Sequence, residues 1–207
     1  MSERLATAAS LVATMPTWRP HHITNWIAAW RGSPGALDAG MPWLAWSCID
    51  WLEPRVRPGM RVLEFGGGGS TLFFLLRDCV VTTVEGNRSW ADELAQRTQP
   101  FPGRSDVRFV DSQSGSALLA AAYAAEGRDG APWDIILVDG AFRRACVEVA
   151  RGSIAPGGLI IVDNTDLPEY AEVKPELVLP GFRRRVFRSL GFARVKPTTT
   201  EVYEAPR

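Results

Sequence analysis

The period of the hydrophobic pattern changes along the chain and divides it into two parts. Before residue 58, apolar residues recur every three or four positions, which predicts helices over 3–14, 23–31 and 42–52. Beyond that point, short apolar runs bounded by glycine, proline or acidic residues alternate with amphipathic stretches, a pattern typical of alternating strands and helices. We therefore expect a helical lid over 1–58 and one larger α/β domain over 59–207.

Five apolar runs predict parallel strands, because a helix-length stretch follows each of the first four. The expected strands are 62–65, 81–85, 107–110, 133–139 and 157–162, and the helices are 72–76, 89–97, 116–126 and 142–150. Two later runs, 182–189 and 192–204, have no helix between them and predict an antiparallel pair at the sheet edge. The expected fold is α/β, a Rossmann-like, doubly wound and mostly parallel seven-stranded sheet with an N-terminal helical extension.

The composition restricts the partners that the chain can have. Lys plus Arg and Asp plus Glu both number 23, so no net charge attracts nucleic acid or an anionic membrane. No run approaches the roughly 18 apolar residues of a membrane-spanning helix. Three widely spaced cysteines fit a reducing compartment better than a disulfide framework. We expect a soluble, cytoplasmic protein with neither nucleic acid nor membrane as partner.

The glycine run at 66–69 lies between a predicted strand and a predicted helix, in the sequence EFGGGGST. Glycine adopts positive φ freely and lets a ligand approach the backbone, so we expect the functional site here rather than a plain flexible loop. The dinucleotide spacing G-x-G-x-x-G is not met, because Thr71 stands where the third glycine would be.

An acidic residue stands at the end of each predicted parallel strand: Glu64, Glu85, Asp111, Asp139 and Asp163. The carboxyl ends of parallel strands meet at one edge, where these charges would repel each other unless a cationic ligand or a metal were shared. A pyrophosphate would be disfavoured there. Glu85 follows Gly66 by 19 residues, the position from which an acid binds a ribose diol. A ligand with a ribose and positive charge, such as S-adenosylmethionine, fits these requirements.

The segments VLEFGGGGST, TTVEGN, FVD, IILVDG and PGGLIIVDN, in this order over 60–164, resemble the class I S-adenosylmethionine-dependent methyltransferases. Ser70 stands where many members have a third glycine. The resemblance implies S-adenosylmethionine as cofactor and a set of residues around it. These are Glu64, Gly66 and Gly68 at the methionine end, Ser70 next to them as a further cofactor-binding residue, Glu85 at the ribose, Asp111 or Ser112 at the adenine, and Asp139 facing the donor methyl group.

The sequence after the fourth strand, Asp139-Gly-Ala-Phe142, lacks the two prolines expected of enzymes that methylate base amines. It is more similar to the catechol-type O-methyltransferases, whose resemblance implies Mg²⁺ held by Asp139, Asp163 and Asn164. Their catalytic lysine is absent here, and only Arg143 and Arg144 are near. We expect methyl transfer to a small-molecule acceptor, preferably at oxygen. Asp139 and His22 are the candidate catalytic residues, and His21, Asp163 and Asp166 are further candidates for the base.

Other interpretations stay open at this point. The chain could bind S-adenosylmethionine without catalysis, or Tyr170 and Lys174 could form the Y-x-x-x-K pair of a short-chain dehydrogenase, although Pro168 and Pro175 flank that pair. Six of the eight tryptophans lie between residues 18 and 51, where they either pack the helices or form an aromatic wall over a pocket. A homodimer is one arrangement open to the chain.

Overall fold

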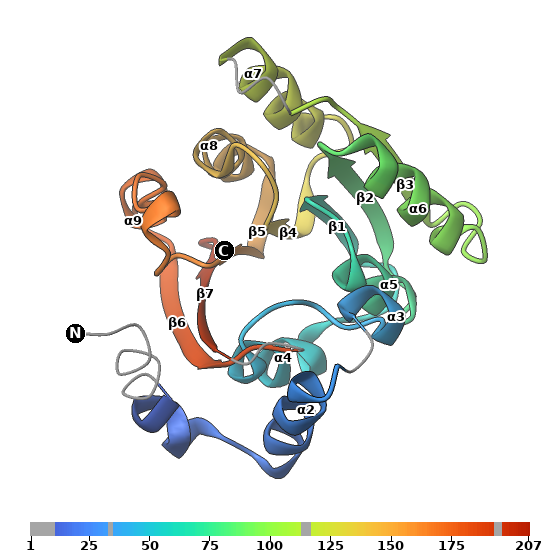
Figure 1. The fold of residues 1–207 in the computed structure, drawn as a ribbon. Helices are drawn as coiled ribbons and strands as arrows, with labels where there is room; N and C mark the ends of the chain where they lie inside the picture. Colours follow the sequence, from blue (N-terminus) through green and yellow to red (C-terminus); the bar gives the residue numbers. More distant parts are fainter. Residues whose placement is uncertain (1–10, 33–34, 113–116, 193–195) are drawn as a thin grey trace.

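The computed structural model describes residues 11–32, 35–112, 117–192 and 196–207. Its centre is a seven-stranded sheet with the order β3-β2-β1-β4-β5-β7-β6 (Figure 1). The strands are β1 Arg61–Phe65, β2 Val80–Glu85, β3 Ser105–Phe109, β4 Trp133–Val138, β5 Ile154–Asp163, β6 Arg183–Leu190 and β7 Pro197–Glu204. The first five are parallel, and β7 runs antiparallel to both β5 and β6. The predicted fold class is confirmed.

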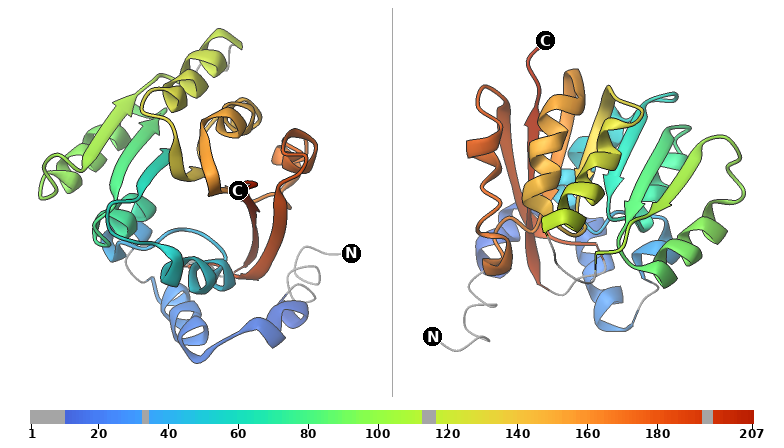
Figure 2. Two further views of the ribbon diagram at one scale, coloured as in Figure 1. Left: turned by 180° about the vertical axis from the view of Figure 1, so that it is seen from behind. Right: turned by 90° about the horizontal axis from the view of Figure 1, so that it is seen from above.

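Helices cover both faces of the sheet (Figures 1 and 2). Helices α4, α5 and α6 lie on one face with α2 and α3 outside them, and α7, α8 and α9 lie on the other. The helices are α2 Pro20–Trp30, α3 Ala36–Ala39, α4 Trp46–Leu52, α5 Gly69–Leu75, α6 Arg88–Thr98, α7 Ala117–Ala125, α8 Arg143–Ser153 and α9 Pro175–Val178. Single 3-10 turns are η1 Met15–Thr17, η2 Glu53–Arg55, η3 Glu126–Arg128 and η4 Pro168–Tyr170.

The central strands are apolar on both sides because each side faces a separate core. In β1, Val62 packs in the core beneath α4 and α5, whereas Leu63 and Phe65 pack in the core beneath α7 and α8. Strand β4 divides in the same way, with Ile135 in the first core and Ile136 in the second. These continuous apolar runs are what made the strands predictable from the sequence.

The N-terminal segment differs most from expectation. Helix α4 begins four residues later than predicted, since Ala45 instead forms a bridge with Gly191 and donates its N–H to Thr200 Oγ1 at 3.0 Å. Helix α3 forms between the helices predicted over 23–31 and 42–52. Most of the helix predicted over 3–14 lies outside the described residues. Among those described, no helix combines the length and apolar character needed to cross a membrane.

The glycine loop is attached to the N-terminal segment by direct backbone contact. A Cβ atom at Gly69 would lie 2.1 Å from Met41 O and 2.3 Å from Ala36 O. The absence of a side chain therefore lets α3 pack against the start of α5. This contact places α3 beside the loop that follows β1.

We predict that Gly69→Ala destabilises the protein by about 1–3 kcal/mol, because α3 must move to admit the methyl group. Gly152→Ala is the matched control. Gly152 also lies in a helix, but its Cβ would meet nothing within 4 Å, so the change should be neutral or stabilise by up to about 1 kcal/mol. Chemical denaturation measures both variants, and equal stability of the two would contradict the packing role of Gly69.

Candidate functional site

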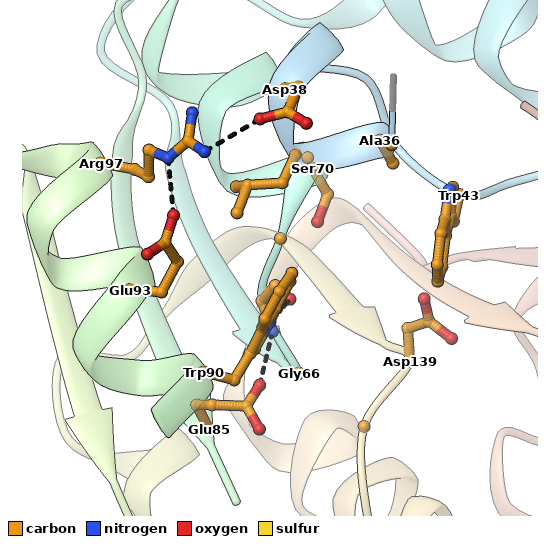
Figure 3. Close-up of a pocket in the computed structure, with 16 residues that line it drawn as sticks. Ala36, Asp38, Trp43, Gly66, Ser70, Glu85, Trp90, Glu93, Arg97 and Asp139 are labelled. Carbon is orange, nitrogen blue, oxygen red and sulfur yellow. Dashed lines mark hydrogen bonds and ion pairs between the residues drawn. The ribbon is translucent and has the colours of Figure 1, made fainter. Parts of the chain in front are cut away.

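A cavity of about 580 Å³ opens at the carboxyl ends of β1, β2 and β4 (Figure 3). Its floor is the glycine loop 66–69 with Ser70, and its walls come from α3, Trp43, Glu85, α6 and the turn at Asp139 and Gly140. This is the edge of a parallel sheet where ligands bind, and the volume is that of a small-molecule site. The sequence-predicted residues Gly66, Gly68, Ser70, Glu85 and Asp139 all border it.

Two glycines of the loop, Gly66 and Gly68, differ in how closely other residues pack around them. Gly66 has a φ of +88°, and a Cβ there would lie 2.6 Å from Gly140 Cα, so this glycine is required by packing between the β1 and β4 loops. Gly68 borders the cavity, and its Cβ would have only an ordinary contact of 3.7 Å with the Trp90 ring. Backbone access for a ligand is therefore best at Gly68.

Glu85 is fixed by backbone donors from two segments. Its Oε2 accepts a hydrogen bond from Gly67 N at 3.2 Å, and its Oε1 accepts from Gly86 N at 2.8 Å and from Asn87 N at 2.9 Å. A carboxylate oxygen can accept further hydrogen bonds, so Glu85 can still bind hydroxyl groups in the cavity. Its position ties the ligand-facing acid to the glycine loop.

Trp90 was not predicted from the sequence. Its Nε1 donates to Gly67 O at 2.8 Å, and its ring borders the cavity beside Gly68. The residue is 40% exposed. Asn87 caps α6 by accepting from Trp90 N at 3.1 Å. An exposed tryptophan in the first turn after a strand-end acid is the signal that could have identified it.

Asp139 is joined to Arg143, the first residue of α8. Arg143 Nη2 donates to Asp139 Oδ1 at 2.8 Å and to Asp139 O at 3.0 Å, while Nη1 donates to Asp163 O. The guanidinium is nearly buried, with 4% of its side chain exposed. The arginine therefore links the ends of β4 and β5.

Comparison with known proteins identifies the fold. No protein-family model matches the chain. Protein-L-isoaspartate O-methyltransferase 1 of Arabidopsis thaliana is 26% identical over 152 residues, which cover 68% of this chain and 63% of that protein. The match thus spans less than two thirds of that relative's length.

Solved structures also indicate a methyltransferase fold. Precorrin 8w decarboxylase from Methanobacterium thermoautotrophicum superposes with a TM-score of 0.58 at 16% identity, covering 83% of this chain and 91% of that one. A 16S rRNA N2 G1207 methyltransferase from T. thermophilus, solved with AdoMet and guanosine, superposes with a TM-score of 0.52 at 17% identity. The superposition covers 76% of this chain and 41% of that one. The chain has the class I methyltransferase fold. The resemblance inferred from the sequence is confirmed at this level.

Within this methyltransferase fold, an arginine or a threonine of the chain contacts each of the three residues expected to hold Mg²⁺. Asp163 is fully buried and accepts from the Thr200 hydroxyl, and Asn164 Nδ2 donates to Thr198 Oγ1 at 2.9 Å. Arg143 contacts Asp139 and lies 3.5 Å from Asn164 Oδ1, so a cation of the protein itself occupies the space between them. The donor set does not fit Mg²⁺, and the expected metal site is not supported.

His22 lies away from the cavity of the methyltransferase fold. It is fully buried against Trp46, and its Nε2 is 3.0 Å from Asp50 Oδ2, while His21 Nε2 is 3.0 Å from Asp50 Oδ1. Burial lowers the pKa of His22, which Asp50 partly opposes. The pair ties α2 to α4 and does not border the described cavity, so the structure gives no support to His22 as the base.

Glu64 lies beneath the glycine loop rather than in the cavity. Its fully buried carboxylate accepts from Thr71 Oγ1 at 2.5 Å and from Thr83 Oγ1 at 3.0 Å, and Thr71 Oγ1 in turn accepts from Gly68 N at 3.1 Å. Burial raises the pKa of Glu64 to about 7, although hydrogen bonds from the hydroxyls of Ser70, Thr71 and Thr83 partly lower it. Its place corrects the expectation of direct cofactor contact: Glu64 shapes the loop from below.

The remaining sequence-predicted residues lie around this cavity at greater remove. Asp111 is exposed after β3, and Ser112 Oγ donates to Gly86 O at 3.2 Å, beside the Glu85 turn. Neither borders the cavity as the described residues define it. Of the proposed dehydrogenase pair, Tyr170 packs its ring 3.8 Å from the Arg143 guanidinium carbon, whereas Lys174 is exposed at the start of α9.

An ion-pair network crosses one rim of the cavity (Figure 3). Arg97 of α6 donates to Asp38 of α3 at 2.9 Å and to Glu93 of α6 at 2.8 Å. Trp43 borders the cavity with 47% of its surface exposed, whereas Trp46 is buried in the core. Both interpretations of the N-terminal tryptophans are thus met, each at a different residue.

Glu64 predicts a distinctive pH dependence of folding. Because its pKa is raised in the folded state, the stability it contributes below its unfolded pKa is lost as pH rises from about 4.5 through 7. Glu64→Gln should abolish this loss, so the variant gains up to about 3 kcal/mol relative to the parent between pH 4.5 and 8. Denaturation across this range measures it, with exposed Glu172→Gln as control. Parallel pH profiles for Glu64→Gln and the parent would refute the prediction.

Proposed function

We propose that the chain is an S-adenosylmethionine-dependent methyltransferase acting on a small-molecule acceptor, preferably at oxygen. The observation that carries the proposal is Glu85, an acid held by three backbone N–H groups at the cavity beside the open backbone of Gly68. An acid at this position accepts hydrogen bonds from the hydroxyls of a ribose.

The charges around the cavity fit a cationic nucleoside. Among the described lining residues, four acidic side chains border it, Asp38, Glu85, Glu93 and Asp139. Arg97 pairs with Asp38 and Glu93, and Arg143 pairs with Asp139. These acids thus still outnumber the arginines that contact them in the described part of the chain. Negative potential of this kind attracts a ligand with an ammonium and a sulfonium group. When bound there, S-adenosylmethionine would supply a methyl group activated by its sulfonium charge.

The residues divide between the two ends of such a ligand. Glu85 would accept the ribose hydroxyls, Trp90 would contact the nucleoside, and Ser112 or Asp111 would border the adenine end. Gly68 and Ser70 would contact the methionine end. The assignments of Glu85, Trp90, Gly68 and Ser70 rest on their places around the cavity. Those of Ser112 and Asp111, which do not border it, rest on the resemblance of the sequence to the methyltransferases.

The acceptor side is assigned to Asp139 and Trp43, which Figure 3 shows across the cavity from Glu85 and Trp90. Segment 36–43 would act as the lid, and Trp43 would supply an apolar surface for a partly aromatic acceptor. Asp139 is the candidate base. The confined volume and the zero net charge favour a small acceptor over a nucleic acid strand.

Isothermal titration tests the cofactor assignment. S-adenosylmethionine should bind with micromolar affinity and NAD should not, and Glu85→Gln should weaken binding about tenfold to a hundredfold because a charged acceptor is lost. Exposed Glu169→Gln is the control and should bind like the parent. Binding of NAD alone, or full affinity in Glu85→Gln, would overturn the assignment.

Catalysis is tested separately by screening small phenols, sugars and amines for formation of S-adenosylhomocysteine. Turnover that depends on a phenol or another hydroxyl compound would support O-methylation. Tight cofactor binding with no turnover on any acceptor class would instead favour a non-catalytic S-adenosylmethionine-binding protein.

A further inference from the structure

The buried Arg143 donates hydrogen bonds to oxygen atoms at the ends of two strands. Besides the two bonds to Asp139, Arg143 Nε donates to Gly140 O at 3.2 Å, Nη1 donates to Asp163 O, and Nη2 lies 3.5 Å from Asn164 Oδ1. All of these acceptors are oxygens, and they come from the segments that follow β4 and β5. A planar guanidinium with five donors suits such a set, whereas a lysine ammonium would reach only part of it.

The position of Arg143 would be unfavourable without these partners. It is the first residue of α8, where the helix dipole disfavours a positive charge, and a buried cation must be paired. The Tyr170 ring lies 3.8 Å from the guanidinium carbon and covers it, adding a cation–π contact. The surrounding oxygens therefore offset the cost of a fixed internal cation that contacts the cavity wall through Asp139.

A second cluster with metal-ligating side chains was weighed against this one. His21, His22 and Asp50 are the described residues whose ligand atoms lie within 4.8 Å of one another. His22 Nδ1 accepts the Arg19 N–H at 3.1 Å, so its Nε2 carries the proton that it donates to Asp50. Arg19 also lies 3.3 Å from Asp50. This protonation state and the nearby arginine both oppose a metal ion, so the cluster is a polar link between helices.

We propose that Arg143 is the built-in cation of this site: it takes the place between the β4 and β5 ends where a divalent metal would bind, and it positions Asp139 in the cavity wall. The inference rests on the proposed function in one respect, because it needs Asp139, assigned there to the acceptor side, to face the donor methyl group and thus to act on the sulfonium charge of S-adenosylmethionine. Arg143 is thus a positioning residue that acts through Asp139.

The first test needs no cofactor activity. Mn²⁺ titrated into the full chain, alone and with S-adenosylhomocysteine, should show no stoichiometric site, since the guanidinium fills that space. Cofactor affinity should be unchanged after dialysis against EDTA. A Mn²⁺ site that disappears in Asp163→Asn would overturn the inference, whatever the outcome for the proposed function.

The second test measures how Arg143 and Asp139 are coupled. S-adenosylhomocysteine lacks the sulfonium charge, so the change in the ratio of the two affinities on substitution of Asp139 reports the electrostatic contribution of that residue. Asp139→Asn should reduce the preference for S-adenosylmethionine about tenfold. Arg143→Met should reduce it about as much, because misplacing the Asp139 carboxylate outweighs the removal of the guanidinium charge, and the double variant should show no further loss, because the two residues act in series. Arg143→Lys should lie between Arg143→Met and the parent.

Arg144→Met is the matched control, because Arg144 neighbours Arg143 on α8 but pairs with Glu148 at the surface. It should keep the parent ratio. An unchanged ratio in Arg143→Met, or additive losses in the double variant, would refute the positioning role. Thermal unfolding of each variant separates this result from loss of folding. If the parent binds neither compound, the proposed function fails, and the Mn²⁺ titration still decides the role of Arg143.

Discussion

The cavity depends on a contact in which neither partner has a side chain. Gly66 and Gly140 stand after β1 and β4, and a Cβ on Gly66 would lie 2.6 Å from Gly140 Cα, while a Cβ on Gly140 would lie 2.7 Å from Gly66 N and 2.6 Å from Tyr123 Oη. Backbone can meet backbone only because both residues are glycine. The contact brings the glycine loop and the Asp139 turn together, so the floor of the cavity and the wall at Asp139 both depend on it.

The acids at the strand ends are stabilised one at a time rather than by a single shared cation. Burial shifts Glu64 towards its protonated form and hydroxyl groups hydrogen-bond it, backbone N–H groups hold Glu85, Arg143 pairs with Asp139, and Thr200 donates to Asp163. Their mutual repulsion is therefore weaker than the sequence suggested, and it does not by itself require a ligand. The argument for a cationic nucleoside rests instead on the acids that face the cavity.

The sequence predicted the sheet well because each central strand is apolar on both faces, and such runs have few alternatives in an α/β chain. It also predicted Gly68, Ser70, Glu85 and Asp139 as cavity residues, since strand ends must meet at one edge. The sequence could not predict that Glu64 and His22 are buried away from the cavity, because a residue type alone does not indicate whether its side chain faces a cavity or a core. The role of Arg143 could not be predicted, because its acceptors include backbone carbonyl groups from segments that are far apart in the sequence. In the sequence it stands out only as a basic residue near the position of the absent lysine.

Helix α3 borders the cavity and is held there by contacts of different strength. The Asp38–Arg97 pair across the rim is about half exposed, and such pairs contribute little stability in water. The close contact at Gly69 involves the carbonyl groups of Ala36 and Met41, at the two ends of the short segment that contains α3. Segment 36–43 is thus closely packed where it meets the glycine loop and joined to the rim by an exposed ion pair among the described residues. The shape of this side of the cavity therefore depends more on the absence of a side chain at Gly69 than on the charges at the rim.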